Sequence, residues 1–305
     1  MTETSFDEIY KNIVLDIVHN GKMQQGNVRA KYADGTPAYA KYIHGVNFVI
    51  TPDELPILHT KRVACKTALT EIEWIWQEMS NDVNWLNDRK VTIWDEWKGS
   101  DGTIGLGYGY QLKNRRRQVK ITKDNADERD LKTLQDGDYR QIFRRLNQVE
   151  YILHEIKHNP RSRRIITSLW NVDDLHLMNL EPCVYETQWE VDDDDFLILH
   201  VRQRGADVAN GLPFNVAQYS VLHRLIADVT GKKVGNMYWN IGNAHIYDRH
   251  LETLEQQVER DLSDINSSPK LILPQGDNFF DRRLSQAKIV DYTPLDINFK
   301  YEIAI

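Results

Sequence analysis

The residue best suited to chemistry in this sequence is Cys183, one of only two cysteines, in the segment LEPCVYETQWEV (residues 180–191). A thiol is a good nucleophile only when it is ionised, and nearby cationic groups favour the ionised form. Arg204, Arg163 and Arg164 are candidates for that help. The alternative is an inert buried residue, which is the commoner fate of a lone cysteine. The residue types alone leave covalent catalysis and core packing both open.

Two clusters of basic residues bear on possible ligands. Arg163 and Arg164 directly precede an apolar, strand-like segment, and a rigid pair of guanidiniums suits phosphate because planar donors bind its oxygens in pairs. Ion pairing at an interface would explain the same arginines equally well. The run KNRRRQVKITK (113–123) is followed by the acidic DNADERD. We interpret residues 113–130 as a solvated surface insertion, with a nucleic-acid-binding module as the alternative.

The composition is that of a globular protein without a membrane or disulfide signature. The chain has 305 residues, 41% of them hydrophobic, and a net charge of −7, which excludes a general attraction to nucleic acid or anionic membranes. Two cysteines cannot form a disulfide framework, and no metal-type CxxC spacing occurs. The amphipathic, acidic start lacks the features of a signal peptide. These observations predict a cytoplasmic protein, in the host cytoplasm if the source is viral, with no membrane partner.

The elements that would position these residues alternate irregularly between helix and strand. Helical spacing of apolar residues, or strand-like alternation, predicts a helix over 5–20, a strand over 39–50, a helix over 60–80, a hairpin over 184–204 turning at Asp192–Asp195, a helix over 215–233 closed at Gly231, a strand and polar helix over 237–262, and a terminal strand over 297–305. This order predicts an α+β fold with a mixed sheet, as a single domain over residues 1–305.

Five stretches then carry a family resemblance. In chain order they are VNWLNDRKVTIWDEW, SRRIITSLWNV, EPCVYETQW, RQRGADVANGLPFNVAQY and GNAHIYDRHLE. Their order and spacing resemble the thymidylate synthase family, which includes the phage deoxypyrimidine hydroxymethylases, from about residue 6 to the C-terminus. The resemblance implies one α+β domain with a large mixed β-sheet flanked by helices. It also implies a homodimer that packs through the sheet face.

The resemblance assigns a catalytic role to Cys183 and four other residues. Cys183 would add to C6 of dUMP and make C5 a nucleophile towards the one-carbon unit of the cosubstrate, 5,10-methylenetetrahydrofolate; no metal is implied. Glu71 would be the acid/base carboxylate and Tyr108 an active-site tyrosine. Asp207 would bond the pterin. Asn215 would read the uracil edge, since an amide both donates and accepts, whereas cytosine-specific relatives carry Asp there.

The resemblance also implies two sets of binding residues. The dUMP set comprises Arg29, Arg204 and Asn215, the His245 and Tyr247 pair that holds the 3′-hydroxyl, and Arg163 and Arg164, which would reach across a homodimer into the partner's site. The folate set comprises Lys61, Trp94, Trp97, Asp207, Asn210, Gly211, Phe214 and Ala304. Any one of these residues alone is better explained by core packing, because buried aromatic residues and His/Tyr pairs are common.

Two departures from the synthase pattern bear on the reaction product. The segment RGADVANG places Gly205 where the synthase pattern has a serine near the phosphate, and Asn210 where it has a leucine against the folate. An amide at Asn210 could bind a water that adds to the methylene intermediate. By a narrow margin these departures favour a dUMP hydroxymethylase; the alternative is a thymidylate synthase, in which hydride completes the reaction. The tail YEIAI, which resembles the synthase tail, favours that alternative. An inactive nucleotide-binding homologue is a third reading.

Overall fold

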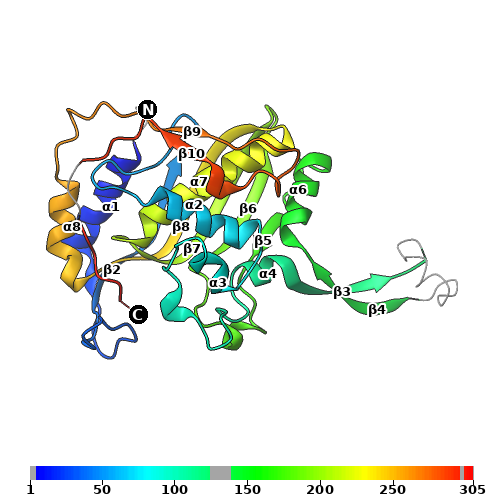
Figure 1. Cartoon of the computed structure of the whole chain (residues 1–305), viewed down its shortest axis with the longest axis horizontal. Helices are drawn as coiled ribbons and strands as arrows, with labels where there is room; N and C mark the ends of the chain where they lie inside the picture. The colour runs from blue at the N-terminus through cyan, green and yellow to red at the C-terminus, as the bar shows by residue number, and fades with distance from the viewer. Residues whose placement is uncertain (1–4, 124–138, 296–298, 305) are drawn as a thin grey trace.

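The computed structural model describes residues 5–123, 139–295 and 299–304, which Figure 1 shows from N- to C-terminus. The helices and strands are α1 (Phe6–Asn20), β1 (Lys22–Met23), β2 (Ala40–Ile50), α2 (Cys65–Trp76), α3 (Val83–Asn87), α4 (Gly109–Asn114), β3 (Arg115–Ile121), β4 (Arg140–Leu146), α6 (Gln148–His158), β5 (Ile165–Ser168), β6 (Val184–Val191), β7 (Phe196–Asp207), α7 (Gly211–Thr230), β8 (Lys233–Tyr247), α8 (Leu251–Val258), β9 (Lys270–Ile272) and β10 (Lys288–Val290). The short helical turns are η1 (Asp95–Trp97), η2 (Leu175–Leu177), η3 (Asp248–His250) and η4 (Leu284–Gln286).

A six-stranded sheet in the order β1-β2-β8-β7-β6-β5 forms the centre of the fold. All neighbouring strands run antiparallel except β7 and β8, which are parallel. A parallel pair needs a long crossover, and the 20-residue helix α7 supplies it. The predicted α+β fold with a large mixed sheet flanked by helices is therefore confirmed.

The predicted elements next to Cys183 form as expected. β6 and β7 pair antiparallel around the acidic turn at residues 192–195, and side chains along β7 alternate between buried and solvent-facing. The helix α7 ends at Gly231, whose φ of 69° is the left-handed conformation that glycine adopts without strain. At the start of the chain, Ser5 caps α1 by accepting from the backbone N–H of Glu8.

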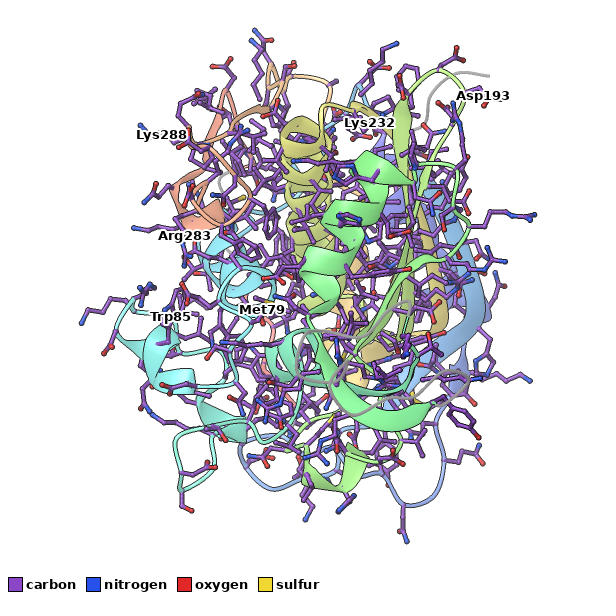
Figure 2. The ribbon with its side chains drawn as sticks, turned by 90° about the vertical axis from the view of Figure 1, so that its right-hand side faces the viewer. Met79, Trp85, Asp193, Lys232, Arg283 and Lys288 are labelled. Atoms are coloured by element: carbon purple, nitrogen blue, oxygen red, sulfur yellow. The ribbon has the colours of Figure 1, made fainter. Side chains whose placement is uncertain are left out.

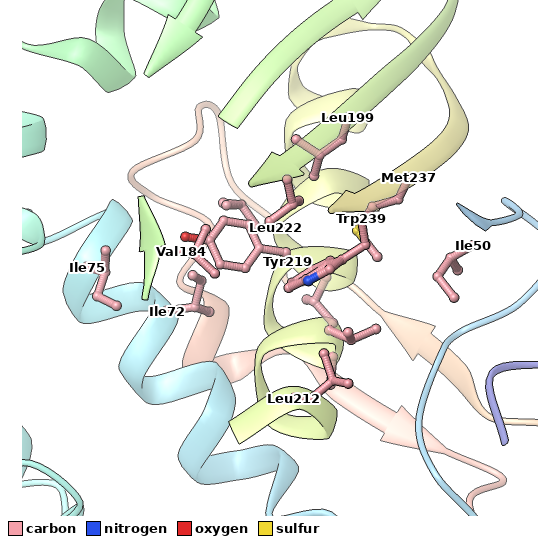
Figure 3. Packing of buried hydrophobic residues seen from close by; sticks show 14 of the residues in the cluster. Ile50, Ile72, Ile75, Val184, Leu199, Leu212, Tyr219, Leu222, Met237 and Trp239 are labelled. Carbon is pink, nitrogen blue, oxygen red and sulfur yellow. The ribbon is translucent and has the colours of Figure 1, made fainter. Parts of the chain in front are cut away.

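Buried aromatic and aliphatic side chains join the helices to one face of the sheet. Figure 3 shows Tyr219 and Leu222 of α7 packed against Trp239, with Ile72 of α2 close by. In Figure 2 no described helix covers the opposite, right-hand face of the sheet. Large apolar side chains are exposed at 36–38%: Val49, Ile166 and Tyr238. One face of the sheet is thus a core layer and the other is open.

The predicted terminal strand over 297–305 is wrong for residues 299–304, which form no strand; the rest of that range lies outside the described residues. The alternation of apolar residues there reflects burial of single side chains rather than pairing with a sheet edge. Tyr301 is 9% exposed, and its hydroxyl donates to Gln257 Oε1 at 2.7 Å. Side-chain contacts therefore hold the C-terminal tail.

The basic run at 113–123 lies largely on a two-stranded ribbon separate from the main sheet. β3 pairs antiparallel with β4, and the ribbon extends away from the body of the molecule in Figure 1. Residues 124–130 of the expected insertion lie outside the described residues. Assignment of 113–130 as a surface insertion stays a prediction, as does the division of the chain into one domain.

Candidate active site

Cys183 lies immediately before β6, where backbone contacts fix it beside Arg204 and Tyr108. Its carbonyl accepts from the Arg204 N–H at 2.9 Å, and its own N–H donates to the Tyr108 hydroxyl at 3.3 Å. Burial raises the pKa of the thiol above its ordinary value, while the Arg204 guanidinium and the Tyr108 hydroxyl oppose that shift. The thiol is therefore protonated, next to two groups that stabilise its thiolate.

Tyr108 is held in an unusual backbone conformation at the N-terminus of α4. Its φ of 48° is in the left-handed region, which costs energy in any residue with a Cβ. The next residue, Gly109, has to be a glycine because a Cβ there would lie 2.4 Å from the Ser80 carbonyl oxygen. The ring of Tyr108 meets Trp94 edge-on, with centroids 4.8 Å apart, and burial raises the tyrosine pKa well above its usual range. A neutral hydroxyl is thus aimed at Cys183.

Glu71 is a buried carboxyl on α2, only 7% exposed. Trp94 Nε1 donates to one of its oxygens at 2.5 Å, and the Gln218 side chain donates to the other. Burial raises its pKa from the ordinary 4.5 to about 7, although both hydrogen bonds act in the opposite direction. A carboxyl that titrates near neutrality can both give and take a proton, which is what a general acid/base requires.

Asn215 belongs to the same hydrogen-bonded network as Glu71. Its Nδ2 donates to Gln218 Oε1 at 3.0 Å, and its Oδ1 accepts from Gln203 Nε2 at 3.2 Å. Gln203 Oε1 in turn accepts from Trp239 Nε1 at 3.0 Å. An unbroken series of side chains from β8 through α7 to α2 therefore orients both the amide and the carboxyl.

Gln203 and Gln218 were not predicted as site residues. Both are almost fully buried, at 2% and 1% exposure. Two weak signals could have found them. Gln218 follows Asn215 by three positions, which places them on one face of α7, and Gln203 occupies an inward position of β7. A buried glutamine in an otherwise apolar stripe requires a partner, and here the partners are the predicted site residues.

His245 and Tyr247 lie on one face of β8, with ring centroids 5.4 Å apart. His245 Nδ1 lies 3.0 Å from Asn243 Oδ1, an amide oxygen that can only accept. Burial lowers the pKa of His245, so the ring is neutral and its Nε2 is left as an acceptor for a hydroxyl. His245 pairs with Asp207 in the parallel ladder between β7 and β8, so the end of β7 lies beside His245.

Two cavities border this centre. The first, about 410 Å³, is lined by Arg29, Tyr42, Asn243, His245 and Tyr247 among others. The second, about 510 Å³, is lined by residues that include Arg204, Trp170, Tyr185 and Gln203. Arg204 Nε and Nη2 donate to the Pro182 and Glu181 carbonyls, at 3.0 and 2.7 Å.

Arg163 and Arg164 do not join the other predicted residues within this chain. They precede β5, whose first residue Ile165 pairs with Trp189, whereas Cys183 lies at the opposite end of β6. At about 3.3 Å per residue the separation along the strand is roughly 20 Å. Both arginines are exposed, as is Arg29. They are available to a second molecule rather than to their own Cys183.

Two of the predicted folate residues, Asp207 and Lys61, contact the turn from β7 to α7, and two others pack against each other. Asp207 Oδ1 accepts from the Ala209 N–H at 3.0 Å, and the Lys61 ammonium donates to the Ala209 carbonyl. Burial lowers the pKa of Lys61 to about 8. Trp94 and Trp97 form an aromatic wall, with centroids 5.6 Å apart.

The remaining predicted folate residues lie at the start of α7 and in the tail. Gly211 and Phe214 are half-buried at the beginning of α7, and Ala304 is half-buried in the C-terminal tail. Asn210 precedes α7, and its Nδ2 lies 3.5 Å from the Tyr301 carbonyl oxygen. The tail thus contacts the predicted folate residue Asn210.

Within the described residues, no group of three or more His, Cys, Asp or Glu side chains could hold a metal ion. Among the same residues, no helix has both the length and the apolar character needed to cross a membrane.

Comparison with known proteins identifies the family. The sequence model of the thymidylate synthase family matches residues 8–305. Thymidylate synthase 1 of Bacillus subtilis (strain 168) and the thymidylate synthase of Bacillus phage phi3T are each 43% identical over 305 residues, covering 99% of this chain and 100% of theirs. The solved structure of thermostable thymidylate synthase A from Bacillus subtilis matches with a TM-score of 0.84 and 42% identity, covering 99% of this chain and 100% of that one.

The fold and the comparisons together define a one-carbon transferase. The chain belongs to the thymidylate synthase family. The cosubstrate of that family is 5,10-methylenetetrahydrofolate, as the sequence predicts.

Proposed function

We propose that this protein is a thymidylate synthase, which converts dUMP and 5,10-methylenetetrahydrofolate into dTMP and dihydrofolate. One observation carries the proposal: Cys183 is fixed beside Tyr108, and Trp94 joins that tyrosine to the network of Glu71 and Asn215. A nucleophile, an acid/base group and a group that reads the base edge are thus assembled before substrate arrives. Such preorganisation lowers the barrier to reaction.

The amide of Asn215 supports uracil as the base. Uracil presents O4 as an acceptor and N3–H as a donor, and an amide can satisfy both. Gln203 and Gln218 fix which end of the Asn215 amide points where, because one donates to its oxygen and the other accepts from its nitrogen. Binding of the base would exchange some of these contacts while the two glutamines keep the amide oriented.

In the proposed reaction the Cys183 thiolate adds to C6, and C5 then attacks the methylene carbon of the cosubstrate. The proton at C5 must leave before the exocyclic methylene can form. Hydride transfer from the tetrahydrofolate to that methylene, with release of Cys183, gives dTMP and dihydrofolate. Glu71, with its pKa of about 7, suits the proton transfers at the ring. Arg204 and Tyr108 stabilise the thiolate that the first step needs.

The preference for a hydroxymethylase is not supported, and its alternative fits better. That preference depends on Asn210 as a water-binding amide, yet the Nδ2 of this amide faces the Tyr301 carbonyl of the tail at 3.5 Å. Gly205 has space for a Cβ, with Asn243 O nearest at 3.9 Å, so nothing around it requires glycine. Similar proteins, including one from a phage, are named thymidylate synthase. Hydride transfer is therefore the preferred final step.

The active form is proposed to be a homodimer packed through the open face of the sheet. Exposed Val49, Ile166 and Tyr238 on the strands, and the distance between Arg163 or Arg164 and their own Cys183, support this proposal. Two arginines from one subunit would then complete the phosphate site of the other. Sedimentation should give the mass of two chains; a monomer that is fully active would contradict this. The cytoplasmic location stays a prediction.

Product identification tests the function. The protein is incubated with dUMP and methylenetetrahydrofolate, and nucleotide and folate products are identified by mass. We expect dTMP and dihydrofolate in equal amounts, and none with the Cys183→Ala variant. Formation of 5-hydroxymethyl-dUMP with tetrahydrofolate would instead establish a hydroxymethylase. The absence of turnover with retained dUMP binding would establish an inactive homologue.

A further inference from the structure

The turn η3 joins β8, which carries His245 and Tyr247, to helix α8. All three of its residues contact segments distant in sequence. The Asp248 carboxylate accepts from the hydroxyl of Tyr32, whose own backbone belongs to the loop over residues 24–39. The other two residues contact both this loop and the C-terminal tail. In Figure 1 the red C-terminal tail passes close to the loop that precedes β2, in keeping with the hydrogen bond from Ala33 to Glu302.

Arg249 binds both segments with one guanidinium. Nη2 donates to Asp34 Oδ2 at 2.7 Å and to Thr36 Oγ1 at 2.8 Å, while Nη1 donates to Glu302 Oε2 at 3.0 Å. Its guanidinium carbon lies 3.9 Å from the centroid of the Tyr32 ring. A planar guanidinium can make these contacts at once, which a lysine ammonium cannot reproduce.

The same two segments also touch each other and meet His250. The Ala33 N–H donates to Glu302 Oε1 at 3.1 Å, so both oxygens of that carboxylate are used. His250 is 3% exposed, and its ring meets Tyr32 and Tyr301 edge-on, with centroids 6.4 and 5.2 Å apart. The turn therefore joins loop and tail through a buried ring as well as through surface charges.

The loop and the tail form walls at two different ends of the substrate site. The loop carries Arg29, which lines the cavity shared with His245 and Tyr247. The tail places the Tyr301 carbonyl against Asn210, and its ring under the Lys61 ammonium, at 4.9 Å. Residues assigned to the nucleotide phosphate and to the folate are thus linked through a turn that belongs to neither set.

We propose that Arg249 is a positioning residue that fixes the tail against the nucleotide loop, and thereby holds the folate side of the site closed to water. This inference rests on the proposed function. The loop has its own backbone support, since Tyr32 N–H donates to the Thr36 carbonyl and Ala38 N–H to the Ala30 carbonyl. The tail forms no strand within the described residues. Loss of Arg249 should therefore release the tail and leave the loop in place.

The first test compares Arg249→Ala with Arg249→Lys and a control. We expect Arg249→Ala to raise KM for methylenetetrahydrofolate about tenfold, because several weak surface contacts and one cation–π contact are lost together. The dissociation constant of dUMP without folate should change less than about threefold, since the backbone hydrogen bonds within the loop remain. A fraction of the product should become 5-hydroxymethyl-dUMP. Arg249→Lys should restore only part of the folate affinity.

The control removes an exposed ion pair elsewhere. Lys270→Ala breaks the Lys270 to Asp291 pair, 3.0 Å long and exposed on both sides, and should leave KM and the product unchanged. Thermal unfolding of each variant shows whether the fold is retained. A stable Arg249→Ala variant with the wild-type KM and only dTMP as product would overturn the proposal.

The second test asks whether the loop acts on the folate side only through Arg249, by combining Arg249→Ala with a change at Asp34, the loop carboxylate that Arg249 binds. Asp34→Asn should raise folate KM about threefold in the otherwise wild-type chain, and have no further effect in the Arg249→Ala background, because the arginine transmits it. Additive effects of the two changes would refute transmission through Arg249.

Direct binding separates this inference from the proposed function. Calorimetry with tetrahydrofolate and saturating dUMP needs no turnover, and Arg249→Ala should weaken this binding about tenfold. If the wild-type chain makes no dTMP but Arg249→Ala weakens tetrahydrofolate binding, the proposed function fails and the positioning role stands. Equal binding by both proteins means that the positioning role fails, whatever the product.

Discussion

The proposed base-reading end and the proposed phosphate end of the site differ in how many of their contacts the single chain supplies. At the base-reading end, Glu71, Asn215, Gln203 and Gln218 are hydrogen-bonded to one another in a buried network. At the proposed phosphate end the arginines are all exposed: Arg29 on the loop before β2, Arg163 and Arg164 before the edge strand β5, and Arg204 on β7. The difference follows from desolvation: neutral amides can be buried when paired, whereas guanidiniums without an anion remain in water. The single chain thus orients the proposed acid/base and base-reading side chains, whereas the proposed phosphate-binding arginines stay exposed to solvent.

Removal of the nucleophile should have the largest effect. Cys183→Ala should lower kcat by at least about 10⁴-fold, because the covalent route is lost entirely. Binding of dUMP should remain, since the arginines and Asn215 are untouched, and titration calorimetry can measure it. Residual turnover within tenfold of wild type would mean that Cys183 is not the nucleophile.

Glu71→Gln should come next, with kcat reduced about 10²- to 10⁴-fold, the range for loss of a general acid/base. The same change also tests the burial of Glu71, through the pH dependence of the free energy of unfolding. The folded pKa of Glu71, about 7, exceeds its ordinary 4.5. The stability that the buried, protonated Glu71 carboxyl contributes is therefore fully present below its ordinary pKa of 4.5. It is lost as pH rises through the folded pKa of about 7.

Thermal and denaturant unfolding at pH 5 and pH 8 measure this contribution. The free energy of unfolding of Glu71→Gln, relative to wild type, should rise over this interval by up to roughly 3 kcal/mol, because the variant has no carboxyl to ionise. A difference that does not vary with pH would show that the Glu71 carboxyl already ionises at its ordinary pKa.

Replacement of the proposed phosphate-binding arginines should reduce activity less, and the loss should depend on the partner subunit. Replacing both Arg163 and Arg164 by Ala should raise KM for dUMP about ten- to a hundredfold, because charge-assisted contacts to phosphate are lost. Mixed with Cys183→Ala chains, these variants should regain activity, since a hybrid dimer contains one site with both intact arginines and Cys183. No recovery after subunit exchange would contradict arginine donation across the dimer.

The smallest effect is expected at Asn210. Asn210→Leu should leave dTMP as the product and change kcat less than about threefold, because a hydrogen bond of 3.5 Å contributes little. Nucleotide mass distinguishes the outcomes. A wild-type chain that makes some 5-hydroxymethyl-dUMP, with less in the variant, would restore a role for Asn210 in holding water.

The two ends also differ in how well the sequence predicts them. The hairpin around Cys183 and the end of α7 at Gly231 follow local rules of turn and cap chemistry. The supporting amides do not, because Gln218 meets Glu71 across 147 positions of sequence. The conformation of Tyr108 depends on the close approach of Gly109 to Ser80, which no local pattern reveals. The alternating pattern of the tail predicts a strand where residues 299–304 form none, because alternation indicates which side chains are buried and not whether the backbone pairs with a sheet.

The covalent step at Cys183 is tested most directly by trapping it. With a 5-fluoro analogue of dUMP and methylenetetrahydrofolate, the C5–F bond replaces the bond to the proton that must leave, so the adduct should persist. Intact-protein mass should increase by the sum of both ligands, and peptide mapping should place them on Cys183. An unchanged protein mass, or an adduct on any other residue, would contradict the account.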